Sequence, residues 1–376
     1  MTKNKHTEIS GRDAIARRDA LENFITARFP GSLQAVMSAV LTSITGLAPS
    51  TRAGRPVWAG SVLRSVVYML VALVAGFLLL MCASPVVKLI GVMGVVFAMR
   101  SFSSAVGHQL THSSKGLPWN ARWTQMGYDV VSALLLLPSF ERYAWVHGGH
   151  HGKVGGPGDP DQELLETLGA RLNGFWPFFG TLLNPVLHWR FLAERLGAVF
   201  GKRPTALIKP GNDASHDPVW RRRLAVLALL SALLLPVPSL FAWWATLVFG
   251  YQVASLLSMI SLHLWWQRPA SGKGVELASA VTFARLLIPE ATWGGVLLLP
   301  LYALVRVLWL QGDLGPGHDL HHAYGTKYPW TEAAYVRTRL LLEGVPLRQT
   351  VSVRAMFRVA FDSAAGSGKL GLGNRT

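Results

Sequence analysis

The chain has 376 residues, of which 51% are hydrophobic and only 15% are charged, and this balance is too apolar for a typical soluble protein. The formal net charge is +16, but lysine and arginine do not gather on one recognisable reading element, which argues against nucleic acid as a partner. A single cysteine, Cys82, excludes an internal disulfide, thiolate metal clusters and Cys-ligated zinc fingers.

Residues 1–65 are polar with scattered apolar positions, and we interpret them as an N-terminal cytoplasmic segment. The segment has no short apolar core followed by a small-residue cleavage site, so no secretory signal peptide is predicted. One interfacial helix is expected around Leu21 to Val36.

Two pairs of apolar runs follow, and proline interrupts each pair. In the first, Val66 to Ala83 is apolar, Ser84-Pro85 breaks the run, and apolar residues then resume. In the second, three arginines precede an apolar run that is interrupted at residues 236–238. Each break favours two helices joined by a tight turn over one impossibly long span. We therefore predict four transmembrane helices in two hairpins, with spans at about 66–83, 86–107, 223–238 and 240–266.

The distribution of positive charge predicts the orientation of these hairpins. Their turns hold one cationic residue, Lys88, whereas the long loops and both termini carry nearly all the others. Cationic loops are retained in the cytoplasm, so both termini are expected there. Residues 286–310 contain Pro289, Glu290, Pro300 and Arg306 and are interpreted as interfacial or core helices. The predicted fold is an all-α integral membrane domain over 66–335 with a cytoplasmic helical cap, followed by a cytoplasmic tail, 336–376, whose end is expected to be disordered.

The histidines form three boxes. The first has spacing i, i+4, and the second and third have spacing i, i+3, i+4, which on a helix puts the imidazoles on one face. The second and third boxes therefore each bring three possible metal ligands together. The boxes consist of His108 and His112; His147, His150 and His151; and His318, His321 and His322.

His263 is a candidate ninth ligand. Counted along the predicted helices, His108 and His263 lie at similar depths, just beyond a hydrocarbon core of roughly 30 Å. Eight or nine imidazoles exceed the needs of one ion, so two metals are expected. Imidazole suits iron, zinc, copper and nickel, and the ligand set alone does not choose among them. His6, His188 and His216 stand outside the boxes and are not predicted to be ligands.

Four aspartates are candidates for orienting the imidazoles. A metal-bound imidazole usually needs its second nitrogen held by a carboxylate or a carbonyl group. A helix cap or a turn would explain these aspartates equally well. The four are Asp129, Asp159, Asp161 and Asp319.

The boxes GHQLTH, HGGHH and HDLHH, separated by the predicted hairpins, resemble those of the membrane fatty acid desaturase and hydroxylase superfamily. The stretch GDPDQE at 158–163 is similar to the Asp-Pro-Asp stretches that follow the second box in many acyl-lipid desaturases. The resemblance covers roughly residues 66–330. It implies that the histidines hold two iron ions, with O2 as co-substrate, and that the enzyme removes hydrogen from an unactivated C–H bond of an acyl chain.

The expected function is desaturation of an acyl lipid or an acyl thioester. A hydroxylase or ketolase of a lipid or carotenoid is the alternative on the same scaffold, because both reactions begin with hydrogen abstraction. No flavin fingerprint, haem motif or iron–sulfur cysteine set is evident, so a separate electron donor of ferredoxin or cytochrome type, with its reductase, is expected. The expected location is the bacterial inner membrane, with the active site in the cytoplasm.

A metal-binding membrane transporter is a remote alternative from a different functional class. Transport would place ionisable ligands within the spans, near the middle of the bilayer. The histidine boxes are instead predicted to lie beyond the spans, which favours the oxygenase.

Overall fold

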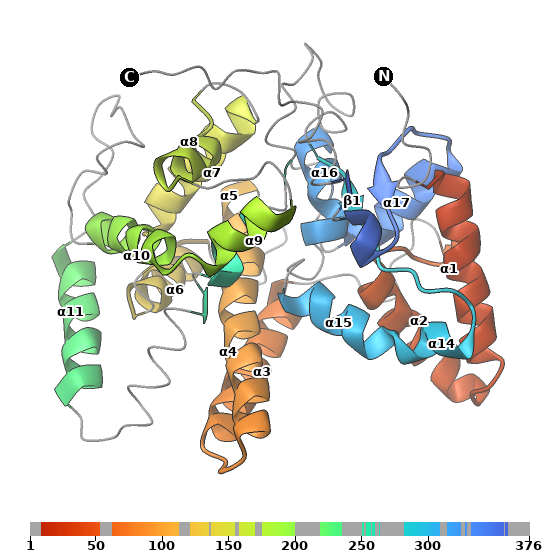
Figure 1. Ribbon diagram of the computed structural model, residues 1–376, viewed down its shortest axis with the longest axis horizontal. Helices are drawn as coiled ribbons and strands as arrows, with labels where there is room; N and C mark the ends of the chain where they lie inside the picture. Colours follow the sequence, from red (N-terminus) through yellow and green to blue (C-terminus); the bar gives the residue numbers. More distant parts are fainter. Residues whose placement is uncertain are drawn as a thin grey trace. The chain divides into compact units, whose positions relative to one another are not determined.

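The computed structural model is mostly helical (Figure 1). It divides into two compact units. We call residues 1–60, 171–181 and 260–376 the terminal unit, and residues 61–170 and 182–259 the hairpin unit. The structure describes residues 9–52, 62–112, 121–134, 137–154, 158–169, 175–199, 219–234, 250–251, 253–256, 258–259, 263, 282–308, 314–324, 328, 332–356 and 358–359.

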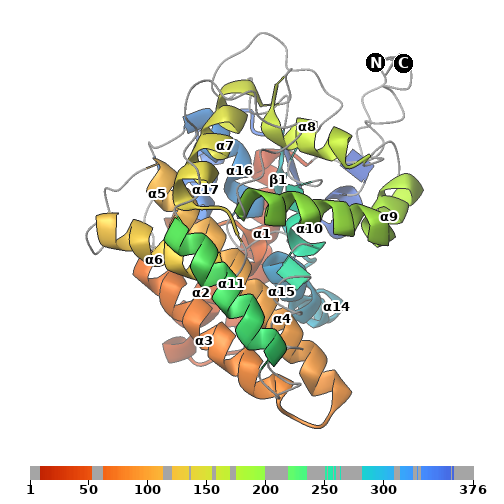
Figure 2. The same cartoon turned by 90° about the vertical axis from the view of Figure 1, so that its left-hand side faces the viewer.

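The hairpin unit is built on two antiparallel helices, α3 (Val62–Leu80) and α4 (Pro85–Phe102), drawn in orange in Figures 1 and 2. Pro85 occupies the first turn of α4, where its missing N–H costs no hydrogen bond. The helices approach closely at Gly76 and Gly91, since a Cβ atom on either would lie 2.8 or 2.7 Å from the carbonyl oxygen of the other. The predicted proline break and tight turn are therefore confirmed at this hairpin.

The remaining helices of the hairpin unit follow α4. A π-helical turn, η2 (Ser103–His108), leads directly into α5 (Gln109–His112). The buried Arg221 of α11 fixes that helix to α6, since it donates to the Ser132 hydroxyl at 2.8 Å and to the Leu137 carbonyl at 3.2 Å. The helices of this unit are α6 (Ala121–Leu134), α7 (Phe140–Lys153), α8 (Pro160–Thr167), α10 (Pro185–Val199) and α11 (Val219–Leu234). Helix α9 (Phe175–Leu183) precedes α10 and lies mostly in the terminal unit.

The terminal unit joins the two ends of the chain. Its strands β1 (Ala284–Arg285) and β2 (Gln349–Thr350) pair in parallel, with Ala284 opposite Gln349 and Arg285 opposite Thr350. Its core contains buried apolar side chains from α1, the β1 segment, α16 and α17. The helical elements are α1 (Gly11–Thr26), α2 (Gly31–Thr45), η1 (Ser50–Arg52), α14 (Trp293–Leu297), α15 (Leu299–Leu308), α16 (Leu314–Tyr324) and α17 (Ala333–Leu342).

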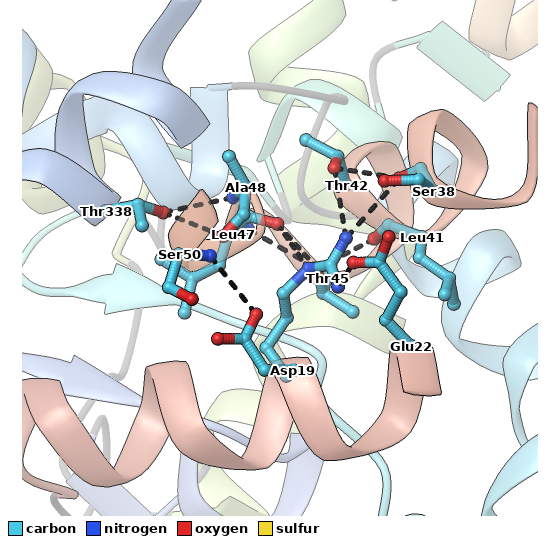
Figure 3. A network of polar contacts seen from close by, with 11 residues as sticks. Asp19, Glu22, Ser38, Leu41, Thr42, Thr45, Leu47, Ala48, Ser50 and Thr338 are labelled. Atoms are coloured by element: carbon cyan, nitrogen blue, oxygen red, sulfur yellow. Dashed lines mark hydrogen bonds and ion pairs between the residues drawn. The ribbon is translucent and has the colours of Figure 1, made fainter. Parts of the chain in front are cut away.

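A polar network links α1 and α2 to the segment that follows them (Figure 3). The buried Arg18 forms an ion pair with Glu22 and donates from Nε to the Leu47 carbonyl at 2.9 Å. Burial lowers the pKa of Arg18, an effect that Glu22 opposes. The same network reaches α17, because the Thr338 hydroxyl donates to the carbonyl of Ala48 and accepts from its N–H. Helices α1 and α2 are thereby fixed to α17.

The prediction of a single helix around Leu21 to Val36 is wrong. Helix α1 ends at Thr26, and α2 begins at Gly31, directly after Pro30. Proline is excluded from a helix interior, because it lacks an N–H and its ring clashes with the preceding turn. The chain therefore bends here and packs α2 back against α1.

The predicted spans are described only in part. The first two correspond to α3 and α4 and the third to α11, while most of 240–266 and the tail from residue 360 lie outside the described residues. Among the described residues, no helix combines the length and the apolar character needed to cross a membrane. The α-helical class is confirmed, and the four-span arrangement stays a prediction.

Candidate metal centre

The terminal unit brings histidines from two separate segments together. His318 and His322 occupy successive turns of α16, and their Nε2 atoms lie 3.1 Å apart. His263 approaches from a distant part of the sequence, with its Nε2 atom 2.9 Å from that of His318. Possible ligand atoms of all three lie within 4.8 Å of one another. His321 of the same helix is also buried, with its ring 5.7 Å from that of His322.

These separations suit a bound metal ion. Two nitrogen ligands at right angles, each bonded at roughly 2.1 Å as in zinc–imidazole sites, lie roughly 3 Å apart. The Nε2 distances of 2.9 and 3.1 Å match this value. Imidazole is a good ligand for iron as well as zinc, so the donor set fits the predicted metal.

The position of α16 is fixed by its contact with α17. A Cβ atom on Gly317 would lie 2.5 Å from the Cβ of Ala333, so only glycine allows this approach. Arg337 of α17 donates from Nε to the Pro316 carbonyl at 2.9 Å and forms an ion pair with Asp319. The helix that carries the third box is therefore held on both sides of His318.

The hairpin unit holds a second histidine cluster. His147 on α7 lies beside His108 and His151, and its ring centroid is 4.5 Å from that of each. His108 ends the π-helical turn η2, a geometry that occurs frequently at functional sites because it changes the direction of a side chain. Tyr143 stacks on His147 with an interplanar angle of 7° and a centroid distance of 5.6 Å.

His150 is held by a buried carboxylate. Its Nδ1 lies 2.9 Å from Oδ1 of Asp159, which also caps α8 by accepting from the Asp161 N–H at 3.0 Å. Burial lowers the pKa of His150, but the charge of Asp161 and the hydrogen bond and charge of Asp159 outweigh it, so the pKa is raised. With Nδ1 facing Asp159, Nε2 is left to bind a metal.

The other predicted site residues lie in different surroundings. His112 ends α5, but its side chain lies outside the described residues, as do His6 and His216. His188 is on α10. Asp129 accepts from the Phe140 N–H at 2.8 Å at the start of α7.

Sequence reasoning missed Tyr143, Arg285 and Arg337. Tyr143 is four residues before His147, a spacing that places it on the same helical face and was available from the sequence. Arg285 and Arg337 are far from any box in sequence, so no local pattern points to them. Their proximity to the third box comes from β1 and α17 packing against α16.

A comparison with known protein families shows the family to which this chain belongs. The family model described as Fatty acid desaturase matches residues 83–272, just over half of the 376-residue chain. The chain belongs to the fatty acid desaturase family. The predicted superfamily is thus confirmed. No curated protein and no solved structure matches this chain.

Membership of the fatty acid desaturase family gives the site its general chemistry. The matched residues include the first two boxes and His263, and they end before the third box. Within the terminal unit, the contact between His263 and His318 connects the third box to the matched region. The family and the histidine clusters together indicate an iron-binding oxidoreductase of the desaturase type with a lipid substrate.

Proposed function

We propose that this chain is an O2-dependent di-iron desaturase that introduces a double bond into the acyl chain of an acyl lipid or acyl thioester. The observation that carries the proposal is the convergence of the Nε2 atoms of His263, His318 and His322 in a desaturase-family chain. Three imidazoles at hydrogen-bond distances, two of them buried and one partly buried, form without a thiolate a ligand set suited to iron.

Two ions are proposed because the chain supplies nine candidate imidazoles, more than one ion can bind. They are His108, His112, His147, His150, His151, His263, His318, His321 and His322. When bound there, iron supplies O2 activation. The chain's own contribution is to hold the ligands: Asp159 fixes the ring of His150, and Arg337 together with Asp319 holds α16.

The overall reaction requires electrons that the chain does not supply. Conversion of a CH2–CH2 unit to CH=CH, with reduction of O2 to two water molecules, consumes two electrons and two protons from outside the substrate. We propose a separate ferredoxin- or cytochrome-type donor, with its reductase. The sequence supports this proposal, since it contains no evident flavin, haem or iron–sulfur motif.

We propose that the chain is embedded in the bacterial inner membrane with its active site and both termini in the cytoplasm. Large apolar side chains are exposed along α3 and α4, including Val71, Leu78 and Val86. In the terminal unit, α2 contains no charged residue, and Leu297 of α14 is 78% exposed. Apolar exposure on this scale supports contact with lipid.

The function is tested by expressing the full chain in a bacterium and profiling its lipids by mass spectrometry. His150→Ala and His321→Ala each remove one candidate ligand, and His188→Ala is the matched control outside the clusters. A new double bond that is present with the wild type and His188→Ala, and lost in the other two, supports the proposal. A new hydroxyl or keto group with the same dependence would instead identify the alternative oxygenase reaction.

Metal analysis of the purified protein is the independent measurement. We expect two iron ions per chain in the wild type and fewer in the two ligand variants. Zinc without iron would contradict an oxygenase.

A further inference from the structure

Three charged side chains are buried beside the third histidine box in the terminal unit. Arg285 is 1% exposed, Asp319 is 1% exposed and Arg337 is 0% exposed. We call these three residues the buried charge cluster. Charged groups almost never occupy such positions unless they are paired, so the way in which their charges balance is informative.

The cluster contains one carboxylate and two guanidinium groups, and the carboxylate is paired with one of them. Asp319 Oδ1 accepts from the Leu320 N–H at 2.9 Å and forms an ion pair with Arg337. Within the described part of the chain, Asp319 Oδ2 and Arg337 Nη1 have no hydrogen-bond partner. Because one positive charge is paired with one negative charge, the Arg337–Asp319 pair is neutral overall.

Arg285 adds a further positive charge. Its strand is fixed by hydrogen bonds from the Ala284 N–H to the Arg348 carbonyl and from the Leu286 N–H to the Thr350 carbonyl, both at 2.9 Å. The side chain lies 4.7 Å from the centroid of the Phe283 ring, and both terminal nitrogens lack a hydrogen-bond partner among the described residues.

The charge of Arg285 persists at neutral pH. Burial lowers its pKa to about 9, partly opposed by the negative charge of Asp319, and this value still leaves the side chain protonated. Two arginines and one aspartate give the cluster a net charge of +1. Asp319 adjoins His318 in α16, and the strand that carries Arg285 packs against the same helix.

We propose that the buried charge cluster raises the reduction potential of the iron bound by the third box, an inference that rests on the proposed function. A fixed positive charge in a poorly solvated interior favours the metal state of lower charge. Hydrogen bonding and burial around the ligands are known means by which proteins tune redox metals. The cluster would ease the one-electron reduction of that ion from ferric to ferrous iron by the separate donor.

Two substitutions of opposite electrostatic sign test this role. Arg285→Met removes one positive charge and should lower the midpoint potential of the iron. Asp319→Asn removes the negative charge and should raise it. A purely structural clamp on α16 would not produce shifts of opposite sign. The measurement is a spectroscopically monitored redox titration of the purified, iron-loaded full chain, with iron per chain determined on the same samples.

Arg18→Met is the matched control. Arg18 is as deeply buried in the same unit, but its charge is balanced locally by Glu22. Its loss should lower stability and leave the potential unchanged. Arg285→Lys retains a cation and should therefore keep the wild-type potential. If Arg285→Met does not fold, Arg285→Gln takes its place, and the same decrease in potential is expected.

The possible outcomes distinguish the charge effect on the potential from the proposed iron-dependent function. Opposite shifts with full iron content support the charge mechanism. Unchanged potentials, shifts of the same sign, or an Arg285→Lys value equal to that of the uncharged variant would overturn it. A wild-type chain that binds no iron would instead defeat the proposed function.

Discussion

Asp159 Oδ1, at the N-cap of α8, lies 2.9 Å from Nδ1 of His150 on α7. Gly158 directly precedes Asp159 and has a φ of +81°, a conformation that glycine adopts readily. The aspartate is fully buried and also caps α8, so its position is fixed from two directions. The imidazole is thereby oriented before any metal binds.

Loss of the Asp159 carboxylate should weaken iron binding. Substitution of a group that orients a metal-bound imidazole typically costs roughly 10- to 100-fold in metal affinity or activity. We expect a loss in this range for Asp159→Asn, measured by iron competition with a chelator. Glu163→Gln, in the first turn of the same helix, is the control and should bind iron like the wild type. Equal affinities for all three proteins would show that Asp159 serves only as a helix cap.

The raised pKa of His150 predicts a pH-dependent stability of the metal-free protein. In the unfolded chain the pKa is near 6.5, and in the folded chain it is higher, because the acidic neighbours outweigh burial. The protonated form is thus favoured by folding. This stabilisation is fully present below about pH 6.5 and is lost as the pH rises through the higher folded value.

The measurement is thermal unfolding of the chelator-treated wild type and His150→Gln between about pH 5 and pH 9. The difference in stability between the two proteins should be largest at the acidic end and should shrink as the pH rises. A difference that grows with pH would contradict the assigned direction of the shift.

The local features of the site were predictable, whereas its long-range supports were not. Spacing alone places His318 and His322 on one helical face, because successive turns of a helix bring residues four apart together. Pro85 likewise predicts the break between α3 and α4. Pro30 likewise predicts a helix break, and a single helix from Leu21 to Val36 conflicts with it. The contact of Arg337 with Asp319 depends on how α17 packs, which no short sequence pattern encodes.

The exposed apolar face of α14 should lie in lipid. In a Cys82→Ser background, which removes the single native cysteine, a spin label at Leu297→Cys should be accessible to oxygen and shielded from a water-soluble relaxing agent in reconstituted vesicles. The control label at Glu343→Cys, at the exposed residue that caps the C-terminus of α17 in the same unit, should show the reverse. A water-accessible label at position 297 would exclude membrane contact there. A label shielded from both agents would indicate a protein partner.

The tight contact between α3 and α4 should tolerate a methyl group at one glycine and not at another. A Cβ atom at Gly91 would lie 2.7 Å from the Gly76 carbonyl oxygen, whereas at Gly94 the nearest atom is 3.4 Å away. Gly91→Ala should therefore destabilise the hairpin by about 1–3 kcal/mol through overpacking. Gly94→Ala should have little effect. Thermal unfolding in detergent compares the two, and equal stability would refute the close helix approach.

The hydrogen bonds between Ala48 and Thr338 join positions 290 residues apart. Because the terminal unit is formed from segments on both sides of the hairpin unit, these bonds can form only after the residues between them have been synthesised. At translation rates of roughly 5–20 residues per second, roughly 15–60 s pass between the synthesis of Ala48 and that of Thr338. The hairpin unit, encoded between them, has all its residues available earlier. Helices α1 and α2, although synthesised before the hairpin unit, therefore complete their packing after its residues are available.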